Sequence, residues 1–281
     1  MGRSTLLVLG AILSVQLGAA AATTLFDEIG PAGTVFYRLL FSALVLLAIW
    51  RPRRSDVSGR PALVLAAVFG VSLAAMNLSF YAALDRIPLG IAVTLEFVGP
   101  LGVALWASRR RADILWVALA AAGVVLLAGP AGSSPDALGV VFALVAGAFW
   151  ASYILISARV GREFEGGRGL ALAMAVGAAL MVAPGIAEGG GDLADPRVIG
   201  VAFAVAMLSS LIPYSFELEA LRRLPVGVFG VLMSLEPGVA ALVGLIALSQ
   251  GLAPAEAAGI ALVMAASVGA LRQPAAAQPE A

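Results

Sequence analysis

The chain has 281 residues, of which 61% are hydrophobic and only 12% are charged, and its mean hydropathy is +1.02. A soluble domain carries roughly 25% charged residues, so this composition excludes a soluble globular protein and indicates a membrane protein. The sequence has no Cys and no His, which excludes disulfides, thiol chemistry and the commonest metal ligand. All 17 basic residues are Arg, which also excludes a Gly-x-x-x-x-Gly-Lys phosphate loop.

Ten apolar segments approach or reach the length that crosses a bilayer, about 20 helical residues. Charged and Gly/Pro-rich breaks place them at 5–26, 33–50, 61–84, 87–107, 114–129, 137–158, 169–187, 198–221, 224–249 and 252–271. We therefore expect an all-α membrane protein with ten transmembrane helices and no soluble domain. The first segment also has the composition of a signal peptide, but its length and its partner in the repeat described below favour a span.

The arginines indicate how the chain is oriented. Fourteen of the 17 fall on the side of the N-terminus, two (Arg86 and Arg197) fall on the opposite side, and Arg38 lies within a span. Loops rich in arginine stay in the cytoplasm. The distribution therefore predicts that both termini are cytoplasmic.

The sequence contains an internal repeat at an offset of 137 residues. RIPLGIAVTLEFVGPLGVAL (86–105) aligns with RLPVGVFGVLMSLEPGVAAL (223–242) and shares with it an arginine, a glycine and two prolines. Because each unit has an odd number of spans, the second is inverted in the bilayer. We expect two inverted five-helix repeats, 1–135 and 136–272, and a cytoplasmic tail, 273–281. Inverted repeats are typical of secondary transporters, whose substrate site lies near mid-membrane between the halves. The identical pairs include Arg86/Arg223, Pro88/Pro225, Gly90/Gly227, Pro100/Pro237 and Ala104/Ala241.

Two carboxylates, Glu96 and Glu236, lie near the centres of the fourth and ninth spans, which correspond in the repeat. Ionisable groups at this depth are costly and are functional by default. Pro100 frees the backbone carbonyl of Glu96, and Pro237 frees that of Met233, at corresponding positions. We therefore expect both carboxylates beside one central cavity. There they either bind the ammonium group of an amino acid, exchange a proton with it, or pair permanently and lock helices together.

Other polar residues complete the expected cavity. Arg38 would recognise a carboxylate or, as we expect, neutralise a glutamate. Ser210, Tyr214 and Glu217 follow i, i+4, i+7 spacing and form one polar stripe on the eighth span. The set suits a small zwitterion better than a large lipid. The remaining candidates are Asn77, Tyr81, Gln16 and Trp150, with Ser14, Ser152, Tyr153 and Phe97 beside them.

With these residues placed, the chain resembles the drug/metabolite transporter superfamily with paired EamA-type domains, and more narrowly the bacterial threonine/homoserine exporter family. The similar stretches are PLGIAVTLEFVGPLGVAL (88–105), the SRRRADILWV that follows, and IPYSFELEALRRLPVGVFGVLMSLEPGVAAL (212–242). The resemblance covers residues 5–272 and implies an inner-membrane exporter of small neutral amino acids with ten helices and inverted halves. The residues that match the family pattern are Glu96, Pro100, Tyr214, Glu217, Glu236 and Pro237.

Two positions depart from the pattern of these relatives. The relatives often carry Leu-Gly-Glu where this chain has Leu-Ser-Gln at 248–250, so no role passes to a carboxylate there. Glu219 stands where an apolar residue is expected. Its place near a span end favours an ion pair with Arg222 or Arg223.

Together these patterns predict a secondary transporter that exports small amino acids, threonine- or homoserine-like, by alternating access. Coupling to protons is a further hypothesis, in which a buried glutamate titrates because the chain has no His. The alternative is an EamA-type exporter of aromatic amino acids, drugs or other metabolites. The remote alternatives are an intramembrane hydrolase and a channel. A hydrolase would need a nucleophile with a base, or paired aspartates, but the chain has no His and no Asp well inside a span, so we do not expect an enzyme. We do not expect a channel either, since no filter motif is present. We expect the amino acid and the lipid bilayer as partners, with no cofactor, metal or nucleic acid; the sequence does not indicate an oligomeric state.

Overall fold

The computed structural model describes residues 2–53, 59–108, 113–128, 136–221, 223–224 and 226–272. The predicted tail 273–281 lies outside the described residues. So do Pro225 of the repeat and five arginines predicted to lie on the side of the N-terminus. These arginines are Arg54, Arg109, Arg110, Arg111 and Arg222.

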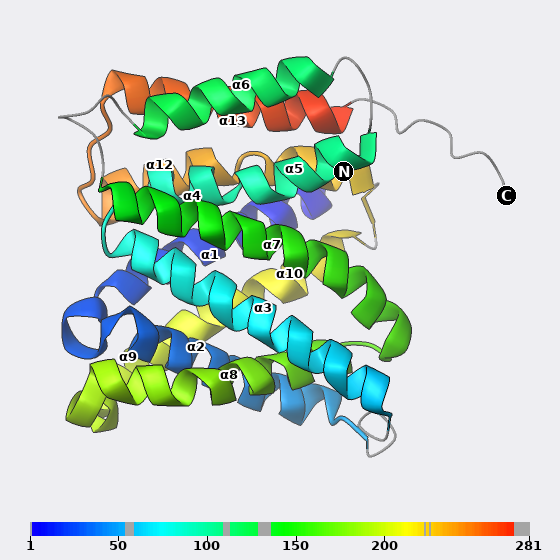
Figure 1. The fold of residues 1–281 in the computed structure, drawn as a ribbon, viewed down its shortest axis with the longest axis vertical. Coiled ribbons are helices and arrows are strands. Elements are labelled where there is room, and N and C mark those ends of the chain that lie inside the picture. Colours follow the sequence, from blue (N-terminus) through cyan, green and yellow to red (C-terminus); the bar gives the residue numbers. More distant parts are fainter. Residues whose placement is uncertain are drawn as a thin grey trace, which may run out of the picture.

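The described chain is helical throughout its regular parts (Figure 1). In chain order the helices are α1 (Gly2–Thr23), α2 (Phe26–Trp50), α3 (Arg60–Leu84), α4 (Leu89–Glu96), α5 (Val98–Ser108), α6 (Asp113–Ala128), α7 (Ala137–Glu163), α8 (Arg168–Gly189), η2 (Gly190–Ala194), α9 (Pro196–Ala206), η3 (Met207–Leu211), α10 (Ile212–Leu221), α11 (Val226–Met233), α12 (Glu236–Ala247) and α13 (Pro254–Arg272).

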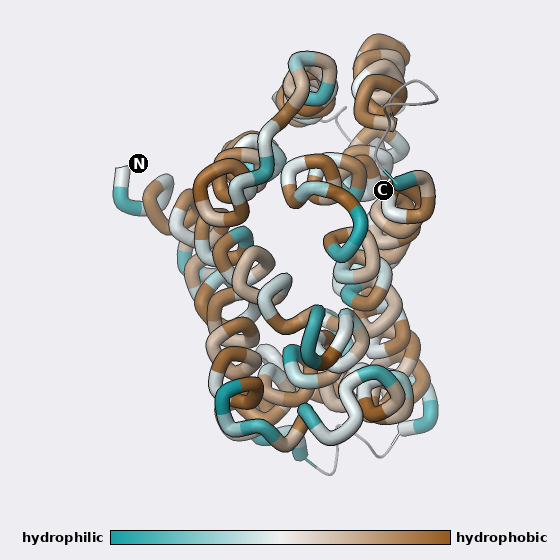
Figure 2. Tube along the Cα trace, turned by 90° about the vertical axis from the view of Figure 1, so that its left-hand side faces the viewer, coloured by the Kyte–Doolittle hydropathy of each residue, from teal (hydrophilic) through white to brown (hydrophobic). Residues whose placement is uncertain are grey.

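Nine helical segments in the described part of the chain are long and apolar enough to cross a membrane, and a tenth, Ile114–Ala128, is apolar but shorter. Large apolar side chains face outward, with Ile246 74% exposed and Ile114 71% exposed. Figure 2 shows hydrophobic residues along most of each helix, with hydrophilic residues gathered mainly near the helix ends. Such a surface requires lipid around it, so the predicted multi-pass membrane architecture is confirmed.

Equivalent helices of the two units run in opposite directions. The start of α2 lies against the end of α8, where the Ala32 N–H donates to Glu188 Oε2 at 2.7 Å. The end of α2 lies against the start of α8, where Trp50 covers Gly166 and Gly167. Another equivalent pair, α6 and α13, is also antiparallel and forms one edge of the molecule (Figure 1). This is the inverted arrangement that the repeat predicts.

Helix α2 begins at Phe26, seven residues before its predicted start at residue 33. Gly30 has a φ of +66°, a conformation that favours glycine. The chain therefore turns at Gly30 after one short turn of helix, and the main part of α2 begins at Pro31. The sequence predicted this main part of α2 but not the short helical turn before it.

The fourth and ninth predicted spans are each interrupted in the middle. The first pieces, α4 and α11, have eight residues each and correspond at the repeat offset. The carbonyl oxygen of Glu96, at the end of α4, packs against α7, because a Cβ added at Gly147 would lie 2.6 Å from it. Glycine at this position lets the two backbones approach closely at the interruption.

Charged residues mark the two ends of the bundle. At one end, Arg86 Nη1 lies 3.4 Å from Asp136 Oδ2, and Asp136 Oδ1 accepts the Gly139 N–H at 3.0 Å to cap α7. This backbone hydrogen bond is the main reason that the pKa of Asp136 is lowered, and Arg86 adds to it. At the opposite end, Arg223 pairs with Glu219 in α10. The predicted pairing of Glu219 is thus confirmed for Arg223.

Single cysteines at positions 86 and 223 are expected to react with a membrane-impermeant maleimide from opposite faces of the bilayer, since the two arginines lie at opposite ends of the bundle. The natural chain has no Cys, so Arg86→Cys and Arg223→Cys each carry one thiol. Labelling of right-side-out and inside-out vesicles measures the result. Arg60→Cys, at the exposed start of α3, is the control that must label from the same face as Arg223→Cys. Labelling of residues 86 and 223 from one face would contradict the inverted arrangement.

Candidate functional site

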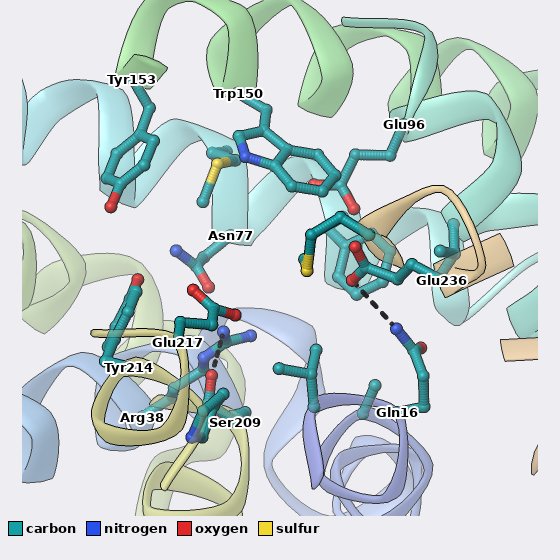
Figure 3. A pocket seen from close by; sticks show the side chains of 17 residues that line it. Gln16, Arg38, Asn77, Glu96, Trp150, Tyr153, Ser209, Tyr214, Glu217 and Glu236 are labelled. Carbon is teal, nitrogen blue, oxygen red and sulfur yellow. Dashed lines mark hydrogen bonds between the residues drawn. The ribbon is translucent and has the colours of Figure 1, made fainter. Parts of the chain in front are cut away.

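A cavity of about 160 Å³ lies at the centre of the bundle, between helices of the two units (Figure 3). Pockets for drug-sized ligands typically measure about 300–1,000 Å³, so this cavity fits a smaller solute. Its lining residues are Val15, Gln16, Ala19, Arg38, Met76, Asn77, Phe80, Val93, Glu96, Trp150, Tyr153, Ser209, Pro213, Tyr214, Glu217, Met233 and Glu236.

Most of the residues singled out in the sequence meet at this cavity. Eight of the nine predicted binding or coupling residues line it, and the ninth, Tyr81, lies behind Arg38. Pro100 and Pro237 are near the helix interruptions and do not line the cavity. The eight that line it are Gln16, Arg38, Asn77, Glu96, Trp150, Tyr214, Glu217 and Glu236.

The backbone around the cavity follows the repeat, whereas the side chains differ between the halves. Gln16 of α1 corresponds at the repeat offset to Tyr153 of α7, and both line the cavity. Corresponding helices of the two units therefore carry different sets of functional groups. On α3 and α10 the matched lining positions are Met76, Asn77 and Phe80 with Pro213, Tyr214 and Glu217.

Arg38 is held from behind by neutral groups. Its Nη1 donates to Tyr81 Oη at 3.1 Å and its Nη2 to the Ser209 carbonyl at 3.2 Å, and the guanidinium carbon lies 5.4 Å from the centre of the Tyr81 ring. Tyr81 is fully buried. Among the described residues Arg38 forms no ion pair, so its expected neutralisation of a glutamate does not take the form of a direct contact and stays a prediction.

The partner of Arg38 arises from a wide helical turn that the sequence reading missed. Met207–Leu211 (η3) is π-helical, and Pro213 follows it. Pro213 has no N–H to donate to a carbonyl four or five residues earlier, and the π-helical turn before it shifts the pattern of backbone hydrogen bonds. The carbonyls of Leu208 and Ser209 accept hydrogen bonds from side chains of other helices. Ser14 Oγ donates to the first at 2.7 Å, and Arg38 donates to the second.

The wide turn also changes which serine faces the cavity. Regular helical spacing predicted Ser210 beside Tyr214 and Glu217, but Ser209 lines the cavity instead. The π-helical turn adds a residue to the helix and shifts the phase of everything before it. The signal for this was Pro213 inside an apolar span, where proline disrupts the regular hydrogen-bond pattern.

On the other side of the cavity, a carboxylate and an amide lie next to each other. Gln16 Nε2 donates to Glu236 Oε1 at 3.2 Å. Gln16 is 1% exposed and Glu236 is 6% exposed. Glu236 begins α12, just after the helix interruption, and Figure 3 shows its carboxyl group near that of Glu96. A third carboxyl group, from Glu217, lies near Arg38 (Figure 3).

Aromatic rings form the remaining walls. Trp150 meets Phe97 edge to face at 5.7 Å between ring centres, and Tyr153 stacks on Phe69 at 5.0 Å. The hydroxyl ends of Tyr153 and Tyr214 point toward each other in Figure 3. The rings fix the width of the cavity and leave the hydroxyls, carboxylates and guanidinium as its polar contacts.

A second, larger cavity of about 740 Å³ lies between α5, α6 and α7 and is lined by apolar side chains and glycine. It offers no polar side-chain group apart from the Trp106 indole, so it does not suit a hydrophilic solute. Among the described residues, no group of three or more His, Cys, Asp or Glu side chains could hold a metal ion. The candidate site is therefore the central cavity.

Comparisons with known proteins agree with a transporter. The model of the EamA-like transporter family matches residues 3–129 and again residues 137–272. Threonine/homoserine exporter RhtA of Escherichia coli (strain K12) is 42% identical over 265 residues, which are 94% of this chain and 89% of that protein. The protein of that name from Salmonella typhimurium (strain LT2) is 41% identical over 266 residues, 94% of this chain and 90% of that protein.

Two more distant matches extend the comparison. The uncharacterized transporter YwfM of Bacillus subtilis (strain 168) is 29% identical over 244 residues, 82% of this chain and 80% of that protein. A solved structure described only as a crystal structure of a protein matches with a TM-score of 0.64 at 20% identity, covering 95% of this chain and 96% of that one. At this identity the likeness shows a shared fold alone.

Proposed function

The chain belongs to the EamA-like transporter family, and we propose that it exports small amino acids of the threonine and homoserine type by alternating access. The central cavity carries this proposal, because it is small, about 160 Å³, and holds a guanidinium on one side and carboxylates on the other (Figure 3). A small zwitterion complements both charges. The names of relatives that are 41–42% identical over 94% of this chain support the same substrate class.

We further propose that the protein lies in a bacterial inner membrane with both termini in the cytoplasm. The excess of arginine on the N-terminal side supports this orientation. In this orientation residue 86 faces the outside and residue 223 the cytoplasm. The division into units 1–135 and 136–272 is part of the proposal, and the two family matches, 3–129 and 137–272, support it.

In this proposal Arg38 binds the carboxylate of the substrate. A guanidinium offers five N–H donors in a planar fork, and the described contacts of Arg38 go to a hydroxyl and a carbonyl, which leave its positive charge without a direct counter-ion. A substrate carboxylate would be bound by charge-assisted hydrogen bonds. Tyr81 lies outside the cavity and acts on the substrate only by positioning Arg38.

Coupling to protons belongs to the same proposal. Glu96, Glu217 and Glu236 bring three carboxyl groups to a cavity that has one guanidinium, from Arg38. Excess negative charge is unfavourable in a site surrounded by hydrocarbon. A substrate ammonium group or a proton would relieve it. Exchange between the two is a means of coupling substrate export to proton entry.

Alternating access is supported by a difference between the two ends of the bundle. Near the Arg86 end, α4 packs closely on α12, since a Cβ added at Gly90 would lie 2.7 Å from the Cα of Ala241. There the Leu89 N–H donates to Gln250 Oε1 at 2.9 Å. The corresponding pair near the other end is α11 and α5, which do not pack on each other to this extent in the described structure. The end predicted to face outward is therefore the more tightly closed.

Release of labelled threonine and homoserine from loaded proteoliposomes is expected to require the protein. Unlabelled threonine and homoserine should compete, whereas aromatic amino acids should compete weakly, because the cavity is small. An imposed pH gradient should accelerate release. Stronger competition by aromatic amino acids or drugs would favour the alternative EamA-type exporter, and release that ignores the gradient would identify a facilitator without proton coupling.

Tyr81→Phe is expected to weaken apparent substrate affinity about tenfold, since a hydrogen bond to a charged group contributes about 1.5–3 kcal/mol. The matched control is Tyr37→Phe, which loses a hydroxyl that donates to the Leu193 carbonyl away from the cavity. Concentration-dependent efflux measures both variants. Equal effects of the two substitutions would show that Tyr81 does not act through Arg38.

Gln250→Ala is expected to open the Arg86 end more readily, because it removes the acceptor of the Leu89 N–H. A cysteine at Val93, on the cavity wall, reports this as maleimide labelling from outside. Loss of one hydrogen bond, about 1 kcal/mol, predicts roughly fivefold faster labelling. Gln250→Glu is the matched control and should not accelerate labelling, since it keeps an acceptor at the start of α4. Equal labelling rates of the Val93 cysteine with Gln, Ala or Glu at position 250 would argue that this hydrogen bond does not help to close the Arg86 end.

A further inference from the structure

The Gln16 and Glu236 side chains are hydrogen-bonded to each other at one side of the cavity, and each also carries a buried oxygen atom without a partner among the described residues. Gln16 uses its amide nitrogen to donate to Glu236 Oε1. The other oxygen of each side chain, Gln16 Oε1 and Glu236 Oε2, is buried and has no hydrogen-bond partner among the described residues. Both side chains line the cavity. The hydrogen bond between them fixes the carboxylate in place.

The chemistry of this pair selects its ligand. A glutamine side-chain oxygen only accepts hydrogen bonds, and so does an ionised carboxylate. Buried acceptors without donors are unfavourable, so the matching ligand group must supply several donors at once. A primary ammonium has three N–H donors and a positive charge, whereas a hydroxyl has one donor and no charge. A carboxylate would be repelled.

The fold places Glu236 at the N-terminus of a helix. Glu236 is the first residue of α12, and the N-terminus of a helix stabilises negative charge. The interruption after α11 creates this helix start in the middle of a membrane-spanning segment. Gln16 reaches it from α1, a helix of the other unit (Figure 3).

The other two carboxyl groups of the cavity are in different surroundings. Glu217 lies near Arg38 (Figure 3). The positive charge of Arg38 would repel an ammonium group at this place. In the described part of the chain no side-chain amide is hydrogen-bonded to Glu96, although its carboxyl group lies near that of Glu236 (Figure 3). The repeat does not duplicate the pair, because Tyr153 stands at the position that corresponds to Gln16. The cavity therefore offers one such acceptor pair.

We propose that Gln16 and Glu236 together form the subsite for the ammonium group of the transported amino acid, with Gln16 acting as a second acceptor that also orients the carboxylate. This rests on the proposed amino-acid export. It assigns the ammonium to Glu236 in preference to Glu96 and Glu217, and gives Gln16 a direct part in substrate selection.

The test compares threonine with 2,3-dihydroxybutanoate, the analogue in which a hydroxyl replaces the ammonium. Competition against labelled threonine efflux gives the apparent affinity of each. The wild type is expected to prefer threonine strongly. Gln16→Met, which keeps length and removes both polar atoms, should weaken threonine binding about tenfold and change binding of the analogue little. Glu236→Gln, which keeps shape and removes charge, should do the same. The preference for threonine must fall in both variants.

Ser72→Ala is the control. Ser72 is a buried polar residue that does not line the cavity, and its Oγ donates to the Phe149 carbonyl. This substitution should leave the ratio of the two affinities unchanged. An unchanged ratio in folded Gln16→Met would overturn the proposed subsite while amino-acid export stands. A wild type that releases no amino acid would refute the proposed function itself.

An inorganic cation could also bind these two oxygens, and a salt titration distinguishes it from an ammonium group. NaCl or KCl is titrated at constant ionic strength, with choline chloride as the replacement, while threonine efflux is measured. No dependence on either cation is expected. Efflux that requires sodium or potassium in the wild type, and loses this requirement in Gln16→Met, would assign the pair to a coupling cation and overturn the ammonium subsite.

Discussion

Backbone groups inside a membrane must find their partners within the protein, and the central cavity is built where this requirement is hardest to meet. In the hydrocarbon region an unpaired carbonyl costs several kcal/mol. The π-helical turn Met207–Leu211 and Pro213 nevertheless interrupt the backbone hydrogen bonds in the middle of a span, where two carbonyls accept from side chains of other helices. One is bound by Ser14 from α1 and the other by Arg38 from α2. This interruption thus determines where three helices meet and where the guanidinium points.

The same requirement explains the small residues around the interruptions. Gly147 lets α7 approach the carbonyl of Glu96, and Gly18 lets α1 approach the backbone of Ser209, since a Cβ there would lie 2.9 Å from its nitrogen. These approaches bring polar side chains from different helices to one place. Gln16, two residues before Gly18, reaches Glu236 in this way. Close backbone packing and a polar cavity are therefore two results of one arrangement.

Much of this could be predicted from the sequence, because the signals were chemical and periodic. Span length, arginine distribution and the repeat predicted ten helices in two inverted units. The rarity of buried charges brought Arg38, Glu96 and Glu236 forward without any structure. Contacts that depend on local geometry could not be predicted. The π-helical turn placed Ser209 where regular spacing predicted Ser210, and Arg38 took neutral partners, one of them a carbonyl of the same turn.

Gln250 shows a further limit of sequence reasoning. In the sequence Gln250 stood out only because relatives often have a glutamate there. In the structure its side-chain oxygen accepts the first N–H of α4. An amide and a carboxylate can both fill this role, so the sequence difference did not abolish the contact.

The repeat also explains how the bundle could close at the end opposite Arg86 and open at the Arg86 end. The tight contact near the Arg86 end is made by Gly90 and Ala241, and the sequence keeps the same residue types, Gly227 and Ala104, at the corresponding positions. An equally close approach of α11 and α5 therefore meets no larger side chain at these positions. The two closures differ little in packing at this contact, so a bound substrate needs only a modest difference in affinity to shift the balance between them. In the proposed function the asymmetric side chains of the cavity supply that difference, since one guanidinium, from Arg38, and one acceptor pair, from Gln16 and Glu236, would hold the substrate in one orientation while the two units move around it.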